Sequence, residues 1–192
     1  NVTFTLFNTT GQVNSTTFTD SRREINFTSL PEGTYTYNVT TFDKASRSNN
    51  TETRLIRLDT TAPTMNYVSP TEASGVFRNQ NFIDVNVTAT DSLTGLGIIT
   101  IRLYNSTLSQ IRINTSTASP FNITYSGLAN GIYYYNSTAN DTVGNTANLE
   151  TRNITLDAAN PSIFYNANTD AHNSFVNRNW VFVNVTASDT NK

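Results

Sequence analysis

Hydrophobic and polar residues alternate along much of the chain, which is the pattern of a β-strand with one buried face. In residues 82–90, Val85, Val87 and Ala89 share one face, while Asn86 and Thr88 lie on the other. The same pattern predicts seven strands, with turn residues between them, at 66–68, 82–90, 99–103, 111–113, 121–125, 132–138 and 149–156. Seven short strands spaced in this way predict an all-β sandwich.

The sequence also repeats itself after about 98 positions. Residues 58–63 match 156–161, 85–91 match 183–189, and 33–40 match 131–138. Residues 2–8 match 99–105 after 97 positions, so one residue was gained or lost between the repeats. A repeat of this length indicates tandem copies of one structural unit.

The small residues and the proline of segment 59–63 predict a linker. If the strands of a complete unit are lettered A to G, residues 1–58 hold strands C to G of one unit. Residues 59–157 hold the linker and a complete unit, and residues 158–192 hold strands A and B of a further unit. Either the chain is a window of a long tandem polypeptide, or strands A and B of one subunit complete the next subunit head to tail. We favour the first, because strand B leads into what resembles an ordinary loop.

The composition is rich in polar residues, with 34 Thr, 28 Asn and 17 Ser. Disorder is the alternative explanation, but 11 Phe and 9 Tyr are spaced as a folded core requires. A net charge of −2 gives no basic surface for nucleic acid. No apolar run is long enough to cross a bilayer, so we expect no membrane insertion in this segment. The lack of Cys excludes disulfides and thiol catalysis.

Residues 30–35 and their repeat, 128–133, resemble the tyrosine corner of immunoglobulin-like folds, with Tyr35 and Tyr133 as the tyrosines. Together with the linker and segment 141–145, this motif resembles the immunoglobulin-like tandem repeats of large bacterial and archaeal cell-surface proteins and adhesins. The resemblance covers essentially the whole chain. It implies tandem immunoglobulin-like, or fibronectin III-like, sandwiches, and it says much less about function.

Asn-x-Ser/Thr occurs about twice as often as composition alone predicts. The Asn residues of these sequons are Asn1, Asn8, Asn14, Asn26, Asn38, Asn49, Asn86, Asn105, Asn114, Asn122, Asn136, Asn140, Asn153 and Asn184. Their number favours N-linked glycans on an extracellular protein, and the surface of an archaeal cell is the preferred location. The alternative is that Asn and Thr are simply common on the outward faces of strands.

Acidic residues gather where the linker and the loops after strands B and F meet at one pole of a sandwich. These are Asp59, Asp91 and Asp141, with Asn145 nearby; Glu32 faces them from the preceding unit. Calcium binds oxygen ligands of this kind, and the family resemblance also suggests calcium at such junctions. The alternative is that each Asp caps its own turn. We expect no other cofactor.

No catalytic residue is predicted. His172, the only His, is replaced by Ser in the other repeat, so we expect it in an exposed loop. Trp180 aligns with Phe82 and is expected to anchor a core. In Tyr133–Tyr135 the outer two tyrosines are expected inside and the middle one outside. The predicted function is structural: a glycosylated extracellular filament or stalk, used for attachment, that is not an enzyme. The alternatives are a ligand-binding adhesin module and a surface-layer component.

Overall fold

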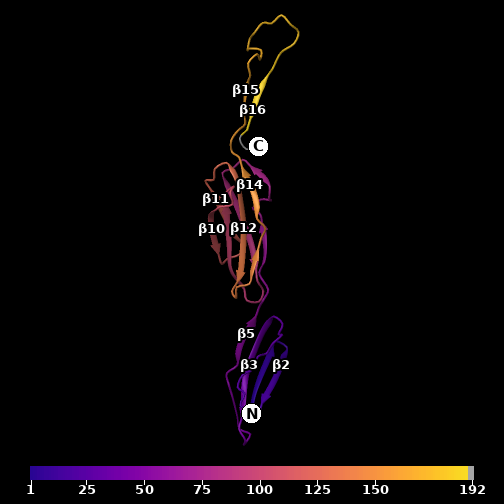
Figure 1. Ribbon diagram of the computed structural model, residues 1–192, viewed down its shortest axis with the longest axis vertical. Helices are drawn as coiled ribbons and strands as arrows, with labels where there is room; N and C mark the ends of the chain where they lie inside the picture. Colours follow the sequence, from indigo (N-terminus) through magenta and orange to yellow (C-terminus); the bar gives the residue numbers. More distant parts are fainter. Residues whose placement is uncertain (190–192) are drawn as a thin grey trace. The chain divides into compact units, whose positions relative to one another are not determined.

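The computed structural model describes residues 1–189, and these residues form sixteen β-strands and no helix (Figure 1). The described chain divides into two compact units. The first comprises Asn1–Met65, Ala89–Ile99 and Ala139–Ala147; the second comprises Asn66–Thr88, Thr100–Thr138 and the chain from Asn148 onward. The all-β prediction is therefore confirmed. The predicted three-part division at residues 58 and 157 stays a prediction, and residues 190–192 of its last part lie outside the described residues.

The first unit contains an antiparallel sheet with the strand order β2-β1-β3-β4, in which β5 also pairs with β3. Its strands are β1 (Val2–Asn8), β2 (Gly11–Phe18), β3 (Gly33–Phe42), β4 (Ser48–Asn50) and β5 (Arg54–Leu58). In the turn between β1 and β2, the Asn8 side-chain oxygen accepts the amide hydrogens of Thr10 and Gly11 at 2.9 and 3.1 Å. Strands β1, β2, β3 and β5 correspond to C, C′, F and G of the predicted unit.

Strand E of residues 1–58 does not form, which corrects the prediction that this part holds strands C to G. Residues 24–28 have no regular structure. Their counterpart in the other repeat is β11 (Phe121–Ser126), which pairs along its length with β8 (Phe82–Thr90). Residues 1–58 contain no counterpart of β8, so the backbone of residues 24–28 has no strand to pair with.

The second unit contains most of a sandwich built from two sheets. One sheet has the order β10-β9-β12-β14-β7, with β13 also paired to β12, and the other has the order β11-β8-β6. The strands not yet given are β6 (Thr64–Val68), β7 (Val76–Arg78), β9 (Leu96–Tyr104), β10 (Gln110–Ser116), β12 (Gly131–Asp141), β13 (Thr146–Asn148) and β14 (Arg152–Leu156). All seven strands predicted for the complete unit are present.

The core of this sandwich follows the alternation seen in the sequence. Every second residue of β8 is buried, as expected for a strand with one face toward the core. The fully buried hydrophobic side chains of the second unit come from both sheets: Ile83, Val85, Val87, Ile101, Leu103, Tyr125, Tyr135, Ile154 and Leu156. Burying apolar surface between two sheets is the main force that stabilises such a fold.

The predicted tyrosine corner is present in both repeats. The Tyr35 hydroxyl donates to the Pro31 carbonyl at 2.9 Å, and the Tyr133 hydroxyl donates to the Ala129 carbonyl at 3.1 Å. Each turn also contains a residue of positive φ at the same repeat position, 59° at Ser29 and 70° at Gly127. Two copies of one turn geometry therefore lie in one chain.

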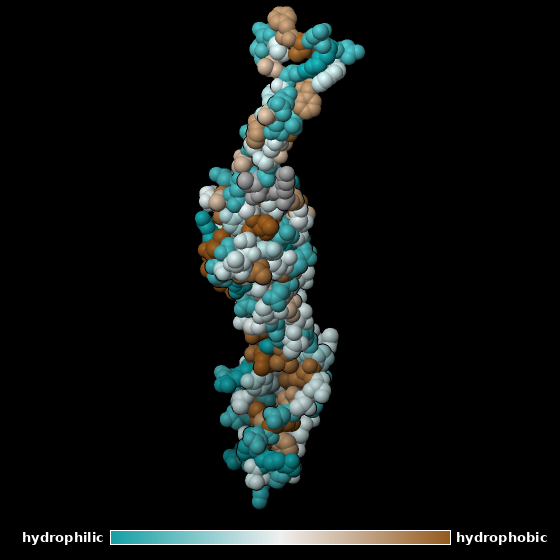
Figure 2. Space-filling view, turned by 45° about the horizontal axis from the view of Figure 1, so that its top comes forward, coloured by the Kyte–Doolittle hydropathy of each residue, from teal (hydrophilic) through white to brown (hydrophobic). Residues whose placement is uncertain are grey.

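The last described strands, β15 (Ser162–Tyr165) and β16 (Val185–Ser188), pair antiparallel as a two-stranded sheet. They match the predicted strands A and B. Trp180 is 58% exposed and lies under the Arg178 guanidinium, 3.8 Å from the ring centre. The expectation that Trp180 anchors a core is therefore wrong for this chain, because residues 158–189 provide no second sheet to cover it. Figure 2 shows that apolar side chains remain on the surface of the chain.

Candidate functional site

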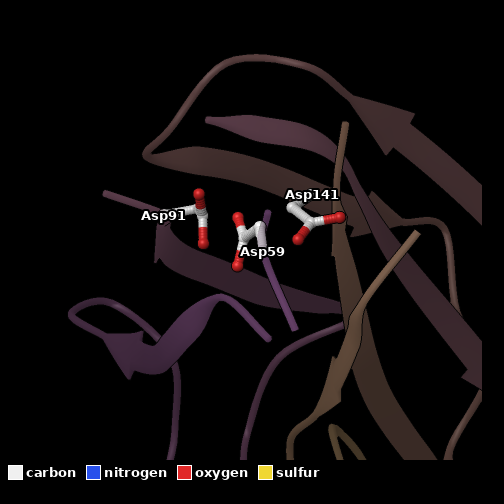
Figure 3. Close-up of side chains that lie close together, drawn as sticks. All are labelled: Asp59, Asp91 and Asp141. Atoms are coloured by element: carbon white, nitrogen blue, oxygen red, sulfur yellow. The ribbon is translucent and has the colours of Figure 1, made fainter. Parts of the chain in front are cut away.

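Three carboxylates that are far apart in the sequence converge in the first unit. Asp59 follows β5, Asp91 follows β8, and Asp141 is the last residue of β12. Their ligand oxygens all lie within 4.8 Å of one another (Figure 3). Asp141 is buried, and the other two are half-buried. The structure thus brings together the three Asp residues that the sequence placed at one pole.

Asp91 and Asp141 each organise the turn that follows them. Oδ1 of Asp91 accepts the amide hydrogens of residues 93, 94 and 95 at 3.1, 2.9 and 2.8 Å. Oδ1 of Asp141 accepts those of residues 143, 144 and 145 at 2.9, 2.6 and 2.9 Å. This is the turn-capping role expected of Asp at the start of a loop. Each of these Oδ1 atoms is therefore already used within its own loop.

Asn145 links two of the three Asp residues through hydrogen bonds. Its Nδ2 donates to Oδ2 of Asp141 at 2.7 Å and to the Asp59 backbone carbonyl at 3.1 Å. Burial favours the neutral form of Asp141, but the hydrogen bonds from Asn145 and from the turn amides outweigh it, so the pKa of this carboxyl lies below its usual value. Asp141 is therefore ionised at neutral pH, and its charge adds to those of its neighbours.

Asp59 connects the linker to the loop after β8. Its Oδ2 accepts the Thr94 hydroxyl at 2.6 Å, and its Oδ1 accepts the Thr61 amide at 3.0 Å. The Thr142 hydroxyl donates to the Thr94 carbonyl at 2.9 Å, which joins the two loops. No sequence pattern predicts the role of Thr94, because a single Thr in a Thr-rich chain is not distinctive.

Glu32 is not part of the acidic cluster, contrary to the expectation. Its carboxylate accepts the Thr60 amide at 2.7 Å, the Thr61 hydroxyl at 2.7 Å, and the Thr60 hydroxyl. These hydrogen bonds, from the Thr60 hydroxyl first, lower the pKa of Glu32. Glu32 therefore holds the linker from the turn before β3.

The same contact recurs at the next linker. Asn130, the repeat counterpart of Glu32, accepts the Ala158 amide at 3.0 Å and donates to Asp157 at 3.2 Å. At both places a side chain from the turn before strand F binds the start of the following linker. This hydrogen bonding between the turn before strand F and the following linker therefore occurs in both repeats.

The sequon residues all lie at exposed or half-buried positions. Seven of the fourteen are exposed: Asn1, Asn8, Asn14, Asn26, Asn49, Asn122 and Asn184. The Asn86 side chain is half-buried: its Nδ2 donates to the Ser69 carbonyl at 2.8 Å, and its Oδ1 is buried without a hydrogen-bond partner. A glycan at Asn86 would need this side chain to rotate outward.

The other residues weighed from the sequence show no site. His172 is exposed, as expected. Tyr135 is buried and its hydroxyl donates to the Glu72 carbonyl at 2.7 Å, whereas Tyr133 and Tyr134 are both half-buried. Among residues 1–189, no helix is long and apolar enough to pass through a membrane.

The sequence matches no protein-family profile and no curated protein. Among solved structures, it is similar to the fibronectin(III)-like modules of Clostridium thermocellum CbhA, with 14% identity and a TM-score of 0.42, over 80% of this chain and 77% of that chain. It is also similar to the BSP domain of a biofilm associated protein, with 20% identity and a TM-score of 0.27, over 83% of this chain and 25% of that chain. The chain thus spans about a quarter of the second structure. These distant likenesses say nothing about what this chain binds.

Proposed function

We propose that this chain is a structural repeat protein of an extracellular filament or stalk that serves in attachment. The observation that carries the proposal is that side-chain hydrogen bonds hold the linker of residues 59–63 in place. Glu32 holds its start through Thr60 and Thr61, and Asp59 joins it to the loop after β8. A linker with this many side-chain hydrogen bonds bends less than a free chain of the same length. Such stiffness suits a protein that bears load.

Electron microscopy of material from the native host tests this role. We expect threads that project from the cell. A two-dimensional lattice would instead indicate a surface-layer component. Specific binding of the isolated chain to a glycan or a cell would indicate a ligand-binding adhesin module. A free particle with neither arrangement would contradict the structural role.

The stiffness has a direct test in Glu32→Ala, because alanine removes all of the hydrogen bonds from Glu32 to the linker. Solution X-ray scattering of the variant should show a broader distribution of chain dimensions than that of the unchanged protein. Glu24→Ala is the matched control, since Glu24 is an exposed Glu of the same unit. Equal distributions for all three proteins would show that the linker is not held by Glu32.

We propose N-linked glycans as part of this function. The support is the excess of sequons and the lack of any buried Asn among them. Sugars on outward strand faces would hinder proteases and lateral pairing of sheet edges. Intact mass of the native protein tests the proposal, and a mass equal to that of the 21.2 kDa polypeptide would contradict it.

A second proposal concerns calcium at the acidic cluster. Three carboxylates within 4.8 Å repel one another, and a divalent cation among them would relieve this repulsion. Calcium takes about six to eight oxygen ligands, so water and carbonyl groups would have to complete the shell. A recess of about 170 Å³, bordered by Thr61 and Thr90, lies beside Asp91 and opens this carboxylate to solvent.

Calorimetry with Ca²⁺ tests this second proposal. We expect calcium to raise the melting temperature of the unchanged chain and to have no effect on Asp59→Asn. Asp157→Asn is the matched control, because Asp157 occupies the same repeat position and instead bonds Asn130 and Ala159. If neither Ca²⁺ nor a chelator changes the melting temperature, calcium does not bind at the acidic cluster.

A further inference from the structure

Two pairs of sequons occupy equivalent positions of the two repeats. Asn8 corresponds to Asn105, and Asn38 corresponds to Asn136. An Asn-x-Ser/Thr triplet is required for an N-linked glycan, but an Asn also recurs where the fold needs the hydrogen bonds of its side chain. The two pairs use their side-chain amides in opposite ways, and this difference separates the two roles.

The Asn105 side chain holds the turn after β9 through its oxygen. Oδ1 accepts the Thr107 amide at 3.1 Å, the Thr107 hydroxyl at 2.8 Å and the Ser109 amide at 2.9 Å. Asn105 is half-buried, but residues 106–109 are exposed. Within the described chain, Nδ2 of Asn105 makes no hydrogen bond. The atom that would carry a sugar is therefore free, and the atom that the turn needs is a different one.

The same arrangement is present at Asn8, which is exposed. Its Oδ1 accepts the Thr10 amide and hydroxyl at 2.9 and 2.8 Å and the Gly11 amide at 3.1 Å. Its Nδ2 likewise has no hydrogen-bond partner among residues 1–189. The last donor is three residues on at Asn8 and four residues on at Asn105, so the two turns differ in length. The sequon and its three donors to Oδ1 are thus present in both turns despite this difference.

Asn136 instead uses both atoms of its amide within the sheet. It lies on β12, between β9 and β14. The Tyr104 hydroxyl of β9 donates to Oδ1 at 3.2 Å, and Nδ2 donates to the hydroxyl of Thr151, the residue before β14, at 3.3 Å. Asn38 repeats the second contact, because its Nδ2 donates to the Thr53 hydroxyl at 3.4 Å. A sugar on Nδ2 would require the amide to turn away from the neighbouring strand, so this pair serves the fold.

The chemistry of glycan transfer favours the turn pair as well. Nδ2 attacks the anomeric carbon of a glycosyl phosphate or pyrophosphate, the bond from that carbon to the phosphate oxygen breaks with its electron pair, and Nδ2 gives a proton to a base of the host transferase. As the proton leaves, negative charge collects on Oδ1. Hydrogen bonds to a charged form stabilise it, so the three donors to Oδ1 of Asn105 assist the reaction. Oδ1 of Asn86, which is buried without a partner, has no such help.

We propose that Asn8 and Asn105 carry N-linked glycans, attached through Nδ2 to the folded chain, and that Asn38 and Asn136 stay unmodified. The inference deepens the proposed function and rests on the proposal that the native protein is glycosylated. It assigns a glycan to the same turn in each repeat, and it gives the Asn of the other pair a purely structural role.

Glycopeptide mass spectrometry of the native protein tests the assignment. Peptides that contain Asn8 or Asn105 should carry sugar, whereas those that contain Asn38 or Asn136 should have the mass of the polypeptide alone. Sugar at all four would mean that the transferase meets the unfolded chain, which overturns the inference. Sugar missing from Asn8 or Asn105 while other sequons are occupied also overturns it, although the protein would still be glycosylated. If none of the sequons carries sugar, the proposed glycosylation fails too.

Variants made in the native host provide a matched comparison by intact mass. Asn105→Asp keeps an oxygen that can accept the hydrogen bonds of the turn but lacks the amide nitrogen, so the mass should fall by one glycan. Asn136→Asp is the control and should lose no sugar. Thr107→Ser keeps the sequon and should keep the glycan, whereas Thr107→Val, which has nearly the same shape as Thr, should lose it. No loss of sugar from Asn105→Asp, or an equal loss from Asn136→Asp, would overturn the proposal.

Discussion

The two matched valines of the repeat allow a quantitative test of the missing-strand argument. Val85 and Val183 occupy the same repeat position, but Val85 is fully buried and Val183 is 62% exposed. We consider Val85→Ala and Val183→Ala, each made alone in the full chain. The two changes are chemically identical, so any difference in effect comes from the environment.

The expected cost at Val85 follows from its burial. Truncation to alanine removes two methyl-sized groups, worth about 0.8 kcal/mol each in transfer free energy. The cavity left behind adds to this, so the free energy of unfolding should fall by about 2 to 3 kcal/mol. In urea, where the slope for small domains is about 1–3 kcal/mol per molar, the midpoint should fall by roughly 1 M.

Val183→Ala should change the free energy of unfolding of the monomer by less than about 0.5 kcal/mol, because the side chain has little to lose. Urea unfolding of the variant measures this difference.

Equal destabilisation of the monomer by both changes would refute the reasoning, since Val183 would then already be packed in the single chain. A control at Val13→Ala, which changes an exposed valine of β2, should leave the free energy of unfolding nearly unchanged.

Four further outcomes are expected. Gly97→Ala places a Cβ 2.8 Å from the Asp141 carbonyl carbon, so urea unfolding should show a loss of at least about 2 kcal/mol. Tyr133→Phe removes the corner hydrogen bond and should cost about 1 kcal/mol in the same assay. The pKa values of Asp141 and Glu32 are lowered by folding, so their contribution is complete above the unfolded pKa near 4 and is lost as the pH falls below it; acid titration of Asp141→Asn should show a shallower loss of stability than the unchanged chain. Removal of calcium by a chelator should lower the melting temperature of the unchanged chain, and an unaltered value would count against the metal.

The sequence predicted the sandwich because alternation over a long strand is a strong signal. Residues 82–90 form β8 as predicted, with buried and half-buried positions in turn. The alternation of hydrophobic and polar residues did not predict β7, because a strand of three residues, Val76–Arg78, is too short to show such alternation. β7 forms because its backbone pairs in parallel with β14, a long-range contact that no local pattern records.

The acidic cluster was predictable because the order of strands brings the linker and two loops to one pole. The contacts of Glu32 were not, because they depend on the path of the linker at Thr60 and Thr61. The errors at Trp180 and at residues 24–28 share one physical cause. Both positions need a strand from another sheet, and neither residues 1–58 nor residues 158–189 contain it.

The most direct test of the proposed structural role is electron microscopy of material from the native host. The account predicts threads that project from the cell. Free particles, arranged neither in threads nor in a lattice, would contradict it.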